Sequence, residues 1–129
     1  MKTRFLILAA LLVAAVSAQT IPIDSVRKVN ANGVPVDSGR TVQITGIFSA
    51  TSEFGGSGPA YIQDNTGGVT LYDASVAGFV VGDSVTASAR VDFYRGLTEL
   101  KSATITPAAS GKTPQPRALQ AAHLGDTAN

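Results

Sequence analysis

The chain has 129 residues, of which 15% are charged, and it contains no cysteine. This length suits one domain with a modest core. The absence of cysteine excludes disulfides and any metal or iron–sulfur site that needs thiolate ligands. The formal net charge is only +1, so electrostatic binding of a polyanion would need local clustering of basic residues.

The N-terminus has the features of an export signal. Lys2 and Arg4 are basic, Phe5–Val16 is apolar, and Val16-Ser17-Ala18 offers small residues before a cleavage site after Ala18. The apolar run is shorter than the roughly 20 residues of a transmembrane helix. We therefore expect a signal peptide (residues 1–18), a secreted, periplasmic or cell-surface protein, and no stable membrane span after processing. An uncleaved membrane anchor is the alternative. Cleavage removes two of the ten basic residues, which leaves eight against nine acidic ones and a net charge of −1.

Residues 19–40 form a lead-in, in which Asp24 or Ser25 is expected to cap one or two helical turns. Thr41–Ser49 alternates apolar and polar residues and predicts the first strand. Gly46 falls in its inward-facing series, where glycine often marks a bulge or a sharp coil in a closing barrel.

After a loop over Thr51–Gly58, two short strands, Tyr61–Gln63 and Val69–Tyr72, are joined by the turn residues Asp64–Gly68. A helical turn is expected at Ala74–Ala77. The remaining two strands form a hairpin, and they are Val85–Phe93 and Leu97–Ile105, with Ser102 as a candidate break in the second.

Five strands, of which the first and fourth are long and marked by glycine, predict an all-β fold. The specific prediction is a small five-stranded Greek-key barrel of the OB type over residues 41–107. A β-sandwich is the alternative, but it usually needs about seven strands. Residues 108–129 contain Pro114-Gln115-Pro116 and are expected to form a linker or flexible tail.

No catalytic constellation can be assembled from these residues. His123 is the single histidine and lies in the expected tail, so a nucleophile–base pair within the barrel is not available. Asp64, Asp73 and Asp83 each sit at a turn, where a carboxylate bonds nearby backbone N–H groups. Their dispersed spacing favours that role over calcium binding. We expect no enzyme activity, no metal and no cofactor.

Alternation along the strands gives the direction of each tyrosine. Ile62, Val69 and Leu71 mark the inward sides of their strands, which places the intervening residues outward. On the long strand, Phe93 shares the inward series of Val85 and Val91. The residues expected outward are Tyr61, Gln63, Thr70, Tyr72, Arg90, Asp92 and Tyr94.

The stretches YIQDNTGGVTLYD and VGDSVTASARVDFYRGLTELK suggest a family. They resemble the OB-fold modules of secreted bacterial multidomain proteins, some of which accompany extracellular nucleases of the endonuclease/exonuclease/phosphatase type. The resemblance covers about Thr41–Pro107. It implies an accessory role, since catalysis in those proteins belongs to a separate domain.

These patterns leave three hypotheses for an exported, non-catalytic module. The first is weak, poorly sequence-selective binding of single-stranded nucleic acid through Tyr61, Gln63, Tyr72, Arg90 and Tyr94, because bases stack on aromatic rings in OB folds. The second is a structural or protein-interaction module, partnered by a protein or a following domain, in which the tyrosines only stabilise the sheet. The third is saccharide binding on the same face, for which the sequence shows no convincing polar cluster.

Overall fold

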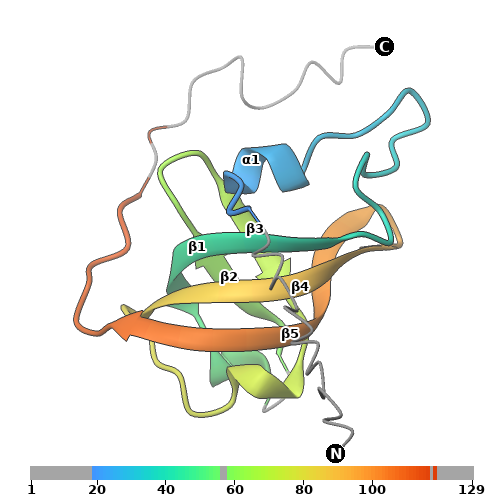
Figure 1. The fold of residues 1–129 in the computed structure, drawn as a ribbon. Helices are drawn as coiled ribbons and strands as arrows, with labels where there is room; N and C mark the ends of the chain where they lie inside the picture. The colour runs from blue at the N-terminus through green and yellow to red at the C-terminus, as the bar shows by residue number, and fades with distance from the viewer. Residues whose placement is uncertain (1–18, 56–57, 117, 119–129) are drawn as a thin grey trace, which may run out of the picture.

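The computed structural model describes residues 19–55, 58–116 and 118, and it is a closed five-stranded β-barrel (Figure 1). The strands follow the order β1-β2-β3-β5-β4 around the barrel. This confirms the expected all-β fold and OB-type barrel. The strand bounds are β1 Thr41–Ala50, β2 Ala60–Gln63, β3 Gly68–Leu71, β4 Ser84–Tyr94 and β5 Leu97–Ala109. The predicted signal peptide lies outside the described residues, as does His123.

β1 pairs antiparallel with both β2 and β4, and parallel pairing of β3 with β5 closes the ring. Gly46 lies where β1 passes close to β2. A Cβ at this position would lie 2.7 Å from both the carbonyl oxygen of Gln63 and Cγ1 of Ile62. The register shift of β1 falls further along, between Phe48 and Ala50. Gly46 therefore permits close strand approach and is not itself the bulge.

Short helical elements lie near both ends of the barrel (Figure 1). Helix α1, Ile23–Val26, places two fully buried side chains in the core. The 3₁₀ turn η2, Ala74–Val76, adds Val76. A further 3₁₀ turn, η1, spans Ser52–Phe54 within the expected loop. The predicted cap of α1 is wrong, because the helix begins at Ile23 and so includes Asp24 and Ser25.

The core consists of the inward-facing strand residues together with α1. The inward series of β4 is fully buried from Val85 to Val91, as predicted. Phe93 is an exception, since it is partly exposed and paired with Thr98 in the distal part of the β4–β5 hairpin. Thr70 lies on the outer face but is only 4% exposed. It pairs with Tyr61 of β2 on one side and with Glu99 of β5 on the other.

Ser102 does not end β5. It adopts a positive φ of 52° within a register shift opposite Ser88–Arg90, and the strand continues to Ala109. The backbone N–H of the next residue, Ala103, donates to Asp73 Oδ2 (3.1 Å). The predicted break is thus a β-bulge tied to the residue that caps η2.

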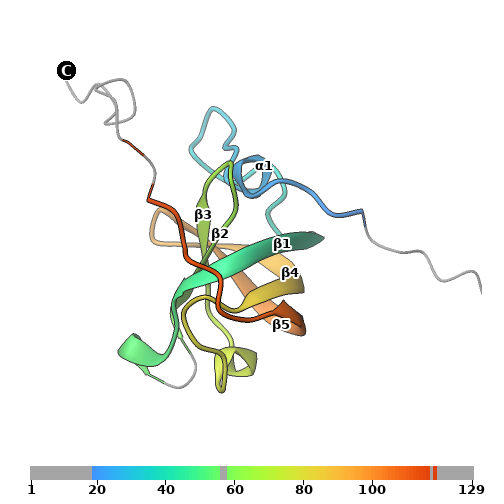
Figure 2. The ribbon, with the colours of Figure 1, turned by 90° about the vertical axis from the view of Figure 1, so that its left-hand side faces the viewer.

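Residues 110–116, which we call the strap, continue from β5 across the outside of β1 (Figure 2). The N–H of Lys112 donates to the carbonyl of Gly82 (2.9 Å). Part of the segment expected as a linker or tail therefore contacts the barrel. Within the described ranges, no helix is long and apolar enough to cross a membrane.

Candidate ligand-binding face

Cross-strand pairing aligns outward-facing residues of four strands in one row. Tyr61 on β2 pairs with Thr70 on β3, and Thr70 pairs with Glu99 on β5. Glu99 pairs in turn with Asp92 on β4. Directly opposed side chains lie roughly 5 Å apart at Cβ. The outer surfaces of β2, β3, β5 and β4 therefore form one continuous face.

Tyr72 and Tyr94 flank Lys101 on this face. The Lys101 Nζ lies 5.9 Å from the ring centroid of Tyr72 and 5.6 Å from that of Tyr94, within the range of cation–π attraction. Together with Glu99 these three residues line a hollow of about 230 Å³, which we call the tyrosine site. The residues Tyr72 and Tyr94 remain 45% and 53% exposed, so part of each is available to a ligand.

Two carboxylates compensate the charge of Lys101. Its Nζ lies 2.7 Å from Glu99 Oε1 and 3.0 Å from Asp92 Oδ2. The Glu99 carboxylate, followed by that of Asp92, raises the pKa of Lys101 above its ordinary range. Lys101, and then the N–H of Phe93, lower the pKa of Asp92. At neutral pH this ammonium is therefore paired, and it offers little free charge to a polyanion.

The arginines of this face form no salt bridge within the described residues. Arg95 lies with its guanidinium carbon 5.3 Å from the Tyr94 ring centroid. The predicted site residue Arg90 is exposed on β4 and donates from Nε to the carbonyl of Gly39 (3.3 Å). Arg90 also attracts the Asp92 carboxylate and helps to lower its pKa. Arg95 is therefore the guanidinium group that lies against a ring of the tyrosine site.

The five residues predicted as a site divide between two places. Tyr72 and Tyr94 share the tyrosine site, with Arg90 on the same face. The ring of Tyr61 instead packs edge-on against Phe54, at a centroid distance of 6.1 Å. Phe54 is 62% exposed, and its position in a loop left no strand pattern that would have pointed to it.

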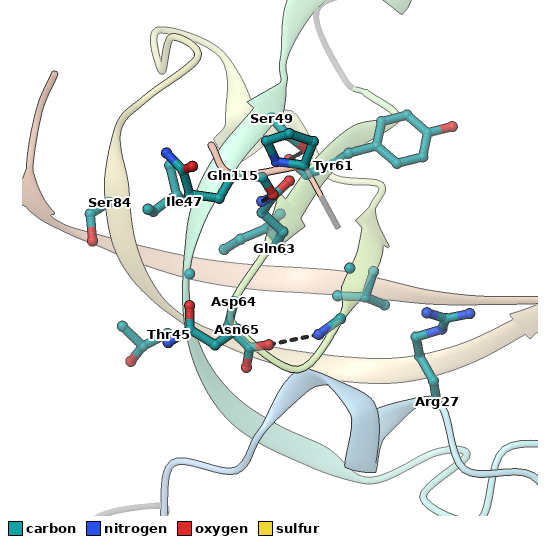
Figure 3. Close-up of a pocket in the computed structure, with 16 residues that line it drawn as sticks. Arg27, Thr45, Ile47, Ser49, Tyr61, Gln63, Asp64, Asn65, Ser84 and Gln115 are labelled. Carbon is teal, nitrogen blue, oxygen red and sulfur yellow. Dashed lines mark hydrogen bonds between the residues drawn. The ribbon is translucent and has the colours of Figure 1, made fainter. Parts of the chain in front are cut away.

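Gln63, the fifth predicted residue, belongs to a second hollow on the outside of β1, β2 and β3 (Figure 3). This groove has a volume of about 930 Å³. Gln63 Nε2 donates to the carbonyl of Gln115 in the strap (2.8 Å). In Figure 3 the ring of Tyr61 points away from Gln115, although Tyr61 also borders the groove. The labelled lining residues are Arg27, Thr45, Ile47, Ser49, Tyr61, Gln63, Asp64, Asn65, Ser84 and Gln115.

The turn aspartates bond backbone groups, as predicted. Asp64 Oδ1 accepts from Thr66 N, Thr66 Oγ1 and Gly67 N, and its Oδ2 accepts from Ile23 N. Burial raises the pKa of Asp64, but these hydrogen bonds outweigh burial, and the pKa lies below its ordinary value. Asp83 Oδ2 accepts from Val80 N (2.9 Å). Across the described positions, no group of three or more histidine, cysteine or acidic residues could hold a metal ion.

Neither a protein-family model nor a curated protein matches the chain. The resemblance to OB-fold accessory modules therefore stays a prediction, and the site must be judged by its own geometry.

Proposed function

We propose that this protein is an exported, non-catalytic OB-type module that binds single-stranded nucleic acid weakly and with little sequence preference. One observation supports the proposal above all: two exposed tyrosine rings flank the tyrosine site, and the guanidinium of Arg95 lies against one of them. Export and the accessory role rest on the predicted signal peptide and on the sequence resemblance.

Stacking supplies most of the affinity in this proposal. Bases stack on the exposed faces of Tyr72 and Tyr94, each contributing about 1–3 kcal/mol. Arg90 and Arg95 contact phosphates, whereas Lys101 orients the rings and stays paired with its carboxylates. Two phosphate contacts to a single strand predict a slope of log K against log salt of about −1.4.

Fluorescence anisotropy of a labelled mixed-sequence single-stranded DNA with residues 19–129 tests the proposal. We expect binding at low salt that weakens at physiological salt. Tyr72→Ala and Tyr94→Ala should each weaken it about five- to 150-fold while the barrel stays folded, since one lost stacking contact is worth about 1–3 kcal/mol. Arg90→Gln should flatten the salt slope, whereas Lys28→Gln, an exposed basic control in the lead-in, should leave binding unchanged. Unchanged affinity in both tyrosine variants would refute the assignment of this face.

A second candidate function has its own supporting observation. Lys101 already contacts both rings, so the tyrosines have a role within the fold. A structural or protein-interaction module predicts no affinity for DNA at low salt and a marked loss of stability in Tyr72→Ala. Urea unfolding of the same variants separates the two candidates.

A further inference from the structure

The strap makes two specific contacts with residues distant in sequence. Lys112 N–H donates to Gly82 O at 2.9 Å, and Gln63 Nε2 donates to Gln115 O at 2.8 Å. Figure 2 shows the strap passing over β1. The strap is thus seated on the groove side of the barrel at two points.

Gly82 permits this approach. It has a φ of +95° and is buried, and a Cβ at this position would collide with the carbonyl oxygen of Lys112. Gly78 provides a contrast in the same connection between β3 and β4. Its φ is +92°, but no described atom lies within 4 Å of the position of its Cβ. The two glycines share a backbone constraint, and only Gly82 contacts the strap.

Both contacts are made to the main chain of the strap, so they do not require particular strap side chains. Pro114 and Pro116 flank Gln115 and restrict the segment to extended, polyproline-like conformations. A preformed extended backbone loses little conformational entropy on docking. Because the barrel is closed, the strap cannot add a strand to a sheet edge. Its backbone instead forms hydrogen bonds with the Gln63 side-chain amide and the carbonyl of Gly82.

The groove extends beyond its present occupant. A hollow of about 930 Å³ remains beside Gln115 and Pro116 and reaches Arg27 at the α1 end. Among the described residues that line it, Arg27 is the one cation and Asp64 the one anion. This balanced, largely uncharged lining suits a neutral peptide backbone better than a polyanion.

We propose that the groove over β1, β2 and β3 is a docking site for an extended, proline-containing peptide, and that the strap is its intramolecular ligand. This site is independent of the tyrosine site and of the proposed nucleic-acid binding.

The first experiment measures binding in trans. The probe is a fluorescent peptide with the sequence of residues 110–116, added to the full chain and to the full-chain variant P114G/P116G. A tethered ligand competes at an effective concentration in the millimolar range. The variant, whose strap is loosened while the barrel residues of the groove are unchanged, should therefore bind the probe at least about tenfold more tightly than the wild type. Adding Gln63→Ala to that variant, or replacing both prolines of the probe by glycine, should reverse the gain. No binding to the variant at millimolar probe would overturn the proposal.

The second experiment measures docking of the strap itself through trypsin cleavage after Lys112. Gly82→Ala should accelerate this cleavage about tenfold by displacing the strap. Gly78→Ala, which carries the same positive-φ strain without the collision, should leave the rate near that of the wild type. Equal acceleration in the two variants would contradict docking at Gly82. If Gly82→Ala fails to fold, the peptide-binding experiment still tests whether the groove accepts the strap sequence.

Discussion

Lys101 connects the candidate site to the stability of the barrel. Its ammonium contacts two tyrosine rings and two carboxylates, one of which, Glu99, is only 4% exposed. Exposed ion pairs contribute little to stability, but a buried carboxylate that loses its partner is costly. Glu99 Oε1 accepts no hydrogen bond of good geometry from the described residues, so Lys101 is the group that compensates its charge.

A double-substitution cycle tests this dependence. Lys101→Met should destabilise the fold because it leaves the Glu99 charge uncompensated. Lys101→Met combined with Glu99→Gln should recover most of the loss, since both charges are then gone. Urea unfolding of the two single variants and the double variant measures the coupling. Additive effects would show that the two side chains act independently.

Asp64 predicts a specific acid sensitivity. Its folded-state pKa lies below the ordinary value of 3.8, so the unfolded chain takes up this proton more readily than the folded one. The stability from Asp64 is therefore fully present above about pH 4 and is lost as the pH falls through the lowered folded pKa. Asp64→Asn should cost about 1–3 kcal/mol at pH 7 and flatten the stability curve below pH 4. If Asp64→Asn leaves the pH dependence of the unfolding free energy below pH 4 unchanged, Asp64 does not contribute to acid sensitivity.

At the scale of elements, β1 and β2 approach closely enough that Gly46 admits no side chain. The limiting atom is a backbone oxygen, that of Gln63, at 2.7 Å from the position of a Cβ. A backbone atom held in a strand cannot rotate away as a side chain would. The closure of the barrel at this corner therefore depends on the glycine.

Gly46→Ala should destabilise the barrel by about 1–3 kcal/mol, as overpacking does in other cores. Gly68→Ala is the matched control, because Gly68 also lies in a strand without a positive φ, and its Cβ would meet the nearest atom at 3.5 Å. It should be neutral or stabilise by up to about 1 kcal/mol. Thermal or urea unfolding of both variants provides the comparison, and equal effects would contradict the steric account.

Alternation of apolar and polar residues predicted the five strands and most of their inward sides, because burial imposes a period of two on each strand. It failed at Phe93, which lies in the distal part of the β4–β5 hairpin and is partly exposed. It also could not predict that Thr70, on the outer face between Tyr61 and Glu99, is only 4% exposed, since the burial of an outward residue depends on neighbouring strands. Nor could it predict the docking of the strap. Proline, glycine and small polar residues favour an extended linker locally, and the contacts come from Gln63 and Gly82, far away in sequence.

At the scale of the whole molecule, the barrel carries two hollows with different chemistry. The tyrosine site combines aromatic rings with a paired lysine and nearby arginines. The groove over β1, β2 and β3 is lined by apolar and uncharged polar residues together with the cation Arg27 and the anion Asp64, and it is bordered by the strap. Tyr72 and Tyr94 belong to the first, and Gln63 to the second. The two proposals therefore concern different surfaces and can be tested separately in one sample.

The most direct test of the central claim is an NMR titration of isotope-labelled residues 19–129 with a short single-stranded DNA at low salt. We predict that chemical-shift changes concentrate at Tyr72, Arg90, Tyr94, Arg95 and Lys101, and that they diminish when salt is raised. The strap and Gln63 should be unaffected. Changes confined to the groove, or no changes at low salt, where electrostatic attraction is strongest, would contradict nucleic-acid binding at the tyrosine site.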